Sequence, residues 1–179
     1  MRTSQTIATN NQTALAGQAS STTASHKPKK PQSSHAAAAA MIRKHIKTLG
    51  IAAKVTSESY AGGSSVRVSV EDLNPATAKQ VEEYADQFQY GHFDGMQDLY
   101  EYSNSRDDIP QVKFVFVNNR PSDEMRQRVW DWARSYYAGM EDAPADAKQA
   151  GSYMHQGMQM WGDMLIHRGF TGALEGFWK

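Results

Sequence analysis

Residues 89–104 read QYGHFDGMQDLYEYSN, and this window holds one histidine, three carboxylates, three tyrosines and two glycines. It lies between a segment with helical periodicity and a segment with strand-like composition. Such a mixture suits a binding or catalytic surface, and it equally suits a tight, well-anchored loop. Composition and spacing alone therefore assign no reaction to the window.

The first folded element upstream of the window is predicted to be a helix. Apolar residues recur at helical spacing over residues 36–49. Ser34 can cap this helix through its hydroxyl, and Gly50 supplies the stop.

A β-hairpin is predicted next. The strand-like runs 51–58 and 64–71 flank residues 60–63, which read YAGG, and paired glycines accept positive φ. In the second run valines alternate with Arg67 and Ser69, so Arg67 is expected on the exposed face. A strand follows the glycines where a phosphate-binding loop would be followed by a helix, so the turn interpretation is favoured.

A second helix and two further strands surround the window. Asn74 and Pro75 supply a cap and a first helical residue, and the helix is expected to end near Gly91. Residues 99–103 predict a short strand. Residues 112–118, which are apolar on both faces after the second position, predict a central strand covered on each side.

Two long helices are predicted to complete an α+β fold. The third helix follows Pro121, with Ser122 as its cap and Trp130 outside its buried stripe. The fourth is expected over residues 144–168. The buried stripe of the third helix is predicted to be Met125, Val129, Trp132, Ala133, Tyr136 and Met140. The predicted fold is a small, mainly antiparallel four-stranded sheet (helix, hairpin, helix, two strands) followed by these two helices.

The length of 179 residues fits one domain with an added helical piece. We expect a disordered polar and basic tail over residues 1–35, an α+β module over 36–120 and a helical annex over 121–179. The tail carries four cations and no acid, so the rest of the chain has a net charge of −4. The tail candidates for nucleic-acid contact are Lys27, Lys29 and Lys30, although a solvated linker is the simpler interpretation.

Composition excludes several classes of site. The chain has no cysteine, which rules out disulfides, thiolate nucleophiles and zinc–thiolate centres. No run approaches the roughly 18 apolar residues of a membrane span, and no membrane association is expected. The lysine and arginine total equals the aspartate and glutamate total, so net charge gives no argument for a nucleic-acid or membrane partner.

The window admits two chemical interpretations. His92, Asp94, Asp98 and Glu101 are ligand types suited to manganese, iron or zinc, but no pair has the helical spacing of helix-borne zinc motifs. The simpler interpretation is a loop in which Asp94 caps its own turn before Gly95. Acid–base catalysis by Asp98 and Glu101, together with Tyr60, Tyr90 or Tyr102, would need a convergence that the sequence does not show. We therefore assign no catalytic residue, no metal and no cofactor.

The third interpretation is a binding face made of aromatic and polar side chains. An arginine among sheet-face aromatics also fits stacking of single-stranded bases, but the net negative charge beyond the tail argues against this as the main task. The candidate surface residues are Tyr60, Gly62, Gly63, Arg67, Tyr90, Gly91, His92, Asp94, Gly95, Asp98, Tyr100, Glu101 and Tyr102.

Three blocks of the sequence carry a family resemblance: SESYAGGSS at 57–65, FQYGHFDGM at 88–96 with YEYSN at 100–104, and DDIPQVKFV at 107–115. Over about residues 36–118 the chain resembles the large polyvalent-protein-associated domain numbered twenty-nine. The resemblance implies a setting in phages and conjugative elements, whose polyvalent proteins are thought to enter a host beside incoming DNA and to protect or establish it. It implies no catalytic residue.

The favoured function is a non-catalytic accessory protein of a phage or mobile element that binds a host or DNA-associated protein partner, with counteraction of host defence as one role. One alternative is a small hydrolytic or metal-dependent enzyme that uses His92, Asp94, Asp98 and Glu101. Another is a structural component of the virion. We expect the chain in the cytoplasm of a bacterial host or packaged in the virion.

Overall fold

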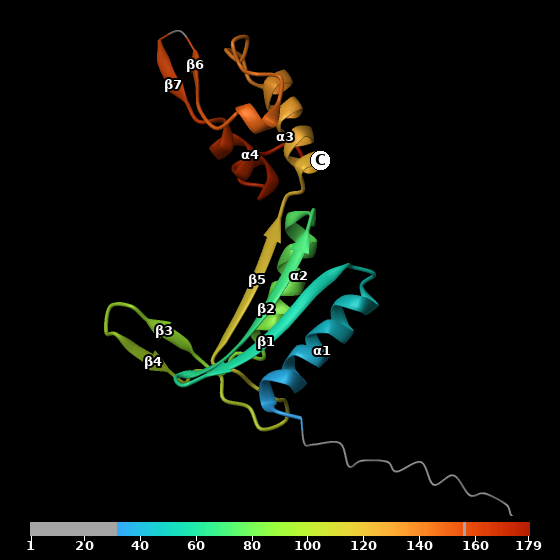
Figure 1. Cartoon of the computed structure of the whole chain (residues 1–179), viewed down its shortest axis with the longest axis vertical. Coiled ribbons are helices and arrows are strands. Elements are labelled where there is room, and N and C mark those ends of the chain that lie inside the picture. The colour runs from blue at the N-terminus through green and yellow to red at the C-terminus, as the bar shows by residue number, and fades with distance from the viewer. Residues whose placement is uncertain (1–31, 156) are drawn as a thin grey trace, which may run out of the picture. The chain divides into compact units, whose positions relative to one another are not determined.

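The computed structural model describes residues 32–155 and 157–179. Within these residues the chain has an α+β fold, with four α-helices, a mixed three-stranded sheet and two small hairpins (Figure 1). The predicted tail disorder and the candidates Lys27, Lys29 and Lys30 lie outside the described residues.

The main sheet consists of β1 (Ala53–Tyr60), β2 (Gly63–Glu71) and β5 (Phe114–Arg120), in the order β1-β2-β5. β1 and β2 form the predicted antiparallel hairpin, whereas β5 runs parallel to β2. The prediction of a four-stranded, mainly antiparallel sheet is therefore wrong. So is the prediction of a central strand at 112–118, because β2 is central and β5 lies at an edge.

The reason is the connection between β2 and β5. It contains α2 (Pro75–Asp86), which carries the chain back along the sheet, and a return of this kind makes neighbouring strands parallel. α2 ends earlier than the predicted Gly91. Beyond it, residue 89 forms an isolated parallel bridge with Val112, two residues before β5.

Both α1 (Ser34–Thr48) and α2 pack on the same face of this sheet (Figure 1). Val66, Val68 and Val70 alternate along β2 and point to that face, as their near-complete burial shows. The core also takes in side chains of both helices and of β1. Its buried members are Ala38, Ala39, Ile42, Ile46, Val55, Val66, Val68, Val70, Val81, Ala85, Phe88 and Val112.

The helix termini agree in part with the sequence predictions. Asn74 caps α2 by accepting from the Thr77 amide, and Gly50 follows α1 with φ 71°. The predicted cap of α1 is wrong, because Ser33 occupies that position and makes no capping hydrogen bond. The Ser34 hydroxyl instead donates to the Gln111 carbonyl at 2.6 Å, which ties α1 to the segment before β5.

A second, smaller hairpin lies within the window of residues 89–104. β3 (His92–Asp94) pairs with β4 (Leu99–Glu101), and neither strand joins the main sheet. The predicted strand at 99–103 thus exists but has a local partner. The hairpin leaves the sheet at the end where β1 turns into β2 (Figure 1).

The segment after the sheet forms a second buried cluster. α3 (Asp123–Tyr136) is capped by Ser122, as predicted. Trp130 is fully buried and donates from Nε1 to the Pro144 carbonyl, whereas Tyr136 is 62% exposed, so the predicted assignment of these two residues is wrong. The buried members are Met125, Val129, Trp130, Ala133, Met140, Ala143, Ala147, Ala150, Ile166 and Phe170.

The long helix predicted over residues 144–168 is also wrong. This region contains a 3-10 turn (Ala147–Gln149), the hairpin strands β6 (Tyr153–His155) and β7 (Met158–Met160), and the shorter helix α4 (Gly162–Phe170). Glycine disfavours helix, and Gly157 takes φ 78° between the two strands. Gly162 lies so close to the Ala150 carbonyl that an added Cβ would be 2.0 Å from its oxygen. α4 is therefore a separate helix, whose first residue packs against the end of the 3-10 turn.

Candidate binding surface

Amide side chains hold the β3–β4 hairpin against β5. Gln89 donates from Nε2 to the Gly91 carbonyl at 2.6 Å and accepts from the Val115 amide at 2.7 Å. One side chain therefore hydrogen-bonds to the backbone just before β3 and to the backbone of β5. Gln89 therefore extends the hydrogen bonding of the sheet edge to the hairpin.

Two further amides close the base of the hairpin. Asn104 donates from Nδ2 to the Gln89 carbonyl at 2.9 Å, and the Asn104 backbone amide donates to the Tyr90 carbonyl at 3.1 Å. Gln111 in turn donates to the carbonyls of Asn104 and Gln87, at 2.7 and 3.1 Å. The hairpin is thus anchored by side chains as well as by backbone pairing.

Gly91 permits a close approach inside this anchor. A Cβ added at this position would be 1.9 Å from the Glu101 carbonyl oxygen and 2.6 Å from Cε1 of Tyr100. No side chain fits at either distance. The glycine therefore lets the Tyr100 ring lie directly over the backbone at the start of the hairpin.

Lys113 connects this ring to the β1–β2 turn. The Tyr100 hydroxyl donates to the Lys113 carbonyl at 2.5 Å, and Lys113 Nζ donates to the Gly62 carbonyl at 3.0 Å. The lysine stem crosses Gly63, where an added Cβ would be 2.7 Å from Lys113 Cδ and where φ is 148°. The glycines at 62 and 63 therefore form the β1–β2 turn, and the missing side chain of Gly63 leaves room for the Lys113 stem.

Five rings form a continuous series, here called the aromatic row. It consists of Phe116, Phe114, Tyr100, Tyr90 and Tyr102. The centroid separations are 6.0 Å from Phe116 to Phe114, 5.5 Å from Phe114 to Tyr100 and 5.7 Å from Tyr100 to Tyr90. Tyr102 stacks on Tyr90 at 5.4 Å with an interplanar angle of 8°. Two rings come from β5 and three from the window, so the row exists only because the hairpin is anchored to that strand.

Cations lie against the row. The Arg67 guanidinium carbon is 4.9 Å from the Phe116 centroid, and Lys113 Nζ is 5.1 Å from the Tyr100 centroid and 5.6 Å from that of Phe114. At these separations the ring quadrupoles attract the charges. Arg67 also approaches Glu58 at 3.7 Å, with both side chains more than half exposed, so that ion pair is weak.

Tyr90 and Tyr100 remain neutral hydrogen-bonding groups. Burial, followed by the nearby Tyr90 and Tyr102 hydroxyls, raises the pKa of Tyr100 to about 12. Burial also raises the pKa of Tyr90, with smaller contributions from Tyr102 and Tyr60. At neutral pH the row therefore offers apolar ring area with phenolic tips.

The row belongs to the face of the sheet opposite α1 and α2. Because side chains alternate along a strand, Phe114 and Phe116 point away from the core, into which Val115 and Val117 pack. Phe116 is 40% exposed and Tyr102 is 70% exposed. Register places Lys54, Arg67 and Arg120 on the same open face, and all three are exposed.

The acidic and imidazole groups of the window are only partly brought together. His92 and Glu101 are cross-strand partners with Nε2 and Oε2 3.3 Å apart, and His92 Nδ1 lies 3.0 Å from the Ser103 hydroxyl. Asp94 accepts from the Met96 amide at 2.8 Å, which confirms that it caps its own turn. Asp98 is exposed in the turn with φ 52°.

Several contributors were not identified from sequence. Lys113, Phe114 and Phe116 were read as parts of a covered central strand, whereas they supply the sheet end of the row. The available signal was the alternation of phenylalanine and valine over residues 114–117, which is typical of a strand with two different faces. Gly95 and Asp98, both candidates, lie in the turn of the hairpin.

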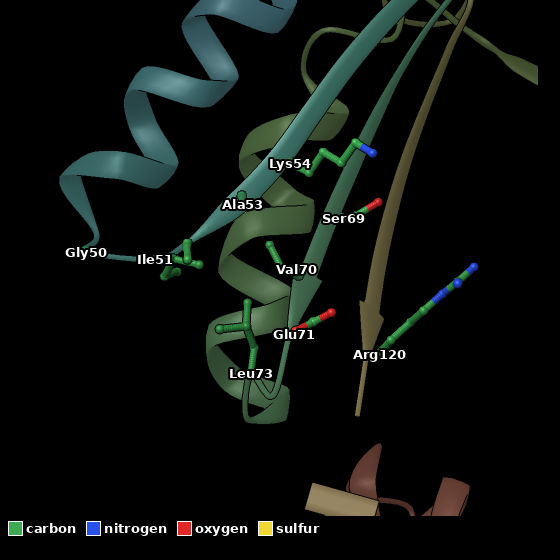
Figure 2. A pocket seen from close by; sticks show the side chains of 10 residues that line it. Gly50, Ile51, Ala53, Lys54, Ser69, Val70, Glu71, Leu73 and Arg120 are labelled. Carbon is green, nitrogen blue, oxygen red and sulfur yellow. The ribbon is translucent and has the colours of Figure 1, made fainter. Parts of the chain in front are cut away.

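A hollow of about 720 Å³ lies at the other end of the sheet (Figure 2). Lys54, Ser69, Glu71 and Arg120 border it on the open face, while Ile51, Val70 and Leu73 border it on the side of α1 and α2 (Figure 2). The ionisable groups around it are two cations and one carboxylate.

Within residues 32–155 and 157–179, no group of three or more histidine, aspartate or glutamate side chains is arranged to hold a metal ion. None of the helices in this part of the chain is long and apolar enough to cross a membrane.

Comparisons with known proteins place the chain in one family. No curated protein and no solved structure was found to match it. The model of large polyvalent protein associated domain 29 matches residues 33–122, which is more than half of the chain and includes β1, β2, β5 and the whole window. That domain is typical of polyvalent proteins of phages and mobile elements. The chain belongs to the family of large polyvalent protein associated domain 29.

Proposed function

We propose that this chain is a non-catalytic accessory protein of a phage or mobile genetic element and that it binds a host or DNA-associated partner through the aromatic row. The observation that carries the proposal is the exposure of Phe116 and Tyr102 at the two ends of an anchored series of rings. Aromatic rings with nearby arginine are typical of recognition surfaces.

The rigidity of the surface supports binding. The side chains of Gln89, Asn104 and Gln111 each make at least two hydrogen bonds at the base of the hairpin. A surface that is ordered before its partner arrives loses less conformational entropy on association. The row therefore has the properties of a preorganised contact surface.

The acidic groups support catalysis less well. The His92 and Glu101 side chains are 56% and 43% exposed, and the Asp94 carboxylate accepts two backbone amides. Acid–base catalysis is favoured where burial and neighbouring charges tune carboxylates inside a pocket. Here the same groups stabilise the hairpin that presents Tyr100 and Tyr102.

Affinity capture with matched variants tests the proposal. The full chain is immobilised and exposed to lysate of bacterial cells that carry the phage or element, and the retained proteins and nucleic acids are identified separately. The Phe116→Ala/Tyr102→Ala variant should lose the material that the wild-type chain enriches. Tyr136→Ala removes a 62% exposed ring from α3 and should retain that material. Equal retention by all three chains would refute a role for the row.

A further inference from the structure

We propose that the partner held by the aromatic row is a single-stranded nucleic acid. This inference rests on the proposed binding function and adds the chemical class of the partner. The combination that carries it is a series of rings on an open sheet face, with cations placed between the rings and along the same face.

The ring arrangement suits bases. Neighbouring centroids are 5.4 to 6.0 Å apart, and Tyr100 meets Phe114, Tyr90 and Tyr102 edge-on. The rings left exposed for stacking are the two ends of the row, Phe116 on the sheet and Tyr102 on the hairpin. Bases of a single strand can be splayed to such separations and can stack on aromatic side chains without regard to sequence. Bases of a duplex are already stacked on one another, so the row discriminates against double strands.

The charges suit the phosphate backbone. Lys54, Arg67 and Arg120 lie on the open face by register, and Lys113 Nζ lies over Phe114 of that face. Two carboxylates, Glu58 and Glu71, share the face, so it carries four cations against two anions. Its local charge is thus positive, although the chain beyond residue 35 is net negative by four charges. This segregation of charge is what attraction of a polyanion requires.

Two of the three acids of the hairpin, Asp94 and Glu101, do not oppose this. His92 pairs with Glu101, and Phe93 pairs with Tyr100. Successive strand residues point to opposite faces, so the Glu101 carboxylate lies on the face of the hairpin opposite the Tyr100 ring. Phe93, which is 53% exposed, shares the face of Tyr100. The row therefore meets apolar area and not carboxylate where it continues onto the hairpin.

Fluorescence anisotropy with defined oligonucleotides tests the inference on the full chain. The probes are a labelled oligothymidine of about 12 nucleotides, within the length that sheet-based single-strand binders cover, and a duplex of equal length. The proteins are the wild type, Phe116→Ala, Tyr102→Ala, Arg67→Ala, the control Tyr136→Ala, and a tail variant with Lys27, Lys29 and Lys30 changed to alanine. Circular dichroism and thermal unfolding establish that each variant is folded.

The expected results follow from stacking and charge. The wild-type chain should bind the single strand more tightly than the duplex. Loss of either ring should weaken binding about tenfold. Tyr136→Ala should match the wild type. The tail variant should bind more weakly in total but should keep the dependence on Phe116 and Tyr102. With two to four phosphate contacts, the affinity should fall with salt at a logarithmic slope of about −1.5 to −3.

A second readout does not depend on substitutions. An oligonucleotide containing 5-iodouracil should cross-link on irradiation to rings of the row, and mass spectrometry should place the adducts at Tyr102, Phe116 or their neighbours. Cross-links confined to the tail would overturn the inference. So would ring variants that bind oligothymidine within about twofold of the wild type, where stacking predicts about tenfold.

The outcomes separate this inference from the proposed function. If the lysate material retained through the row is protein and survives nuclease treatment, while purified oligonucleotides do not bind, the inference fails and the proposed function stands. If neither protein nor nucleic acid depends on the row, both fail.

Discussion

The Tyr100 hydroxyl donates to the Lys113 carbonyl at 2.5 Å, while the ammonium of the same lysine lies 5.1 Å from the Tyr100 centroid. One residue of the hairpin and one residue before β5 are therefore joined twice, by the backbone of the lysine and by its side chain. This double contact sets the position of the central ring of the aromatic row, and it can be tested by stability measurements alone.

The pKa of Tyr100 predicts a pH dependence of stability. Its folded-state pKa of about 12 lies above the ordinary value of 10.0, so the folded chain holds this proton more tightly than the unfolded chain does. The resulting stabilisation is complete below about pH 10 and is lost as the pH rises through about 12. Tyr100→Phe should be less stable near neutrality because it lacks the hydrogen bond to the Lys113 carbonyl, and its free energy of unfolding should fall less steeply between these pH values because it lacks the titrating hydroxyl. Urea unfolding at a series of pH values measures both effects, and parallel profiles would contradict the assignment.

The close approach at Gly91 predicts a large effect of a single methyl group. In Gly91→Ala the added Cβ meets the Glu101 carbonyl oxygen and the Tyr100 ring, so the hairpin must shift. Overpacking of this kind costs about 1 to 3 kcal/mol. Gly95→Ala is the matched control, since no atom lies within 4 Å of its added Cβ, and it should change stability by less than about 1 kcal/mol. Chemical denaturation and the near-ultraviolet circular dichroism of the tyrosines distinguish the two variants. Equal effects would show that the ring does not lie over Gly91.

Ser122 predicts a contrast between two helix caps. Its hydroxyl accepts from the Met125 amide at 3.1 Å and donates to Asp72 at 2.7 Å, so Ser122→Ala removes a cap and leaves that carboxylate with one partner fewer. The expected cost is about 1 to 2 kcal/mol. Ser33 occupies the corresponding position of α1 without a capping bond, so Ser33→Ala should cost less than about 0.5 kcal/mol. Denaturant midpoints of the two variants measure these losses of stability. A larger loss for Ser33→Ala than for Ser122→Ala would contradict the conclusion that Ser122, and not Ser33, caps its helix.

Trp130 and Tyr136 predict opposite sensitivities on one helix. Trp130 is fully buried and bonded to the Pro144 carbonyl, so Trp130→Ala should cost about 3 to 5 kcal/mol. Tyr136 stacks on Trp132 at the surface, and Tyr136→Ala should cost below about 1.5 kcal/mol. Thermal unfolding of both variants measures these two losses of stability. A larger loss for Tyr136→Ala than for Trp130→Ala would support the buried stripe predicted from helical spacing.

Helical spacing failed at Trp130 for a local reason. The apolar residues of α3 cover nearly half of the helix circumference, so periodicity alone admits two neighbouring stripes. The choice depends on which tryptophan finds an acceptor for its N–H group in the folded chain. Trp130 finds the Pro144 carbonyl, 14 positions away.

Some residues of the aromatic row were identified from the sequence, and others were not. Tyr60, Tyr90, Tyr100 and Tyr102 were named from their composition and position. Their role as a binding surface stays a prediction, as does that of Arg67, His92 and Glu101. Phe114, Phe116 and Lys113 are not among the candidates, because the alternation of phenylalanine and valine indicates two different faces but does not show which of the two stays open.

The sequence by itself determined the local features of this protein. It specified the first helix and its glycine stop, the hairpin around Gly62 and Gly63, the caps Asn74 and Ser122, and the turn before Gly95. Each depends on residues only a few positions apart, whose conformational preferences act within one turn or cap.

Only the tertiary structure decided which strands are neighbours and which rings meet. β5 pairs with β2 because the intervening helix returns the chain to the same end of the sheet, and residues 49 positions apart become partners, as Val66 and Val115 do. The aromatic row follows from that pairing and from the amides that anchor the hairpin. Contacts between such distant residues depend on the packing of the whole domain, and local propensity carries no record of them.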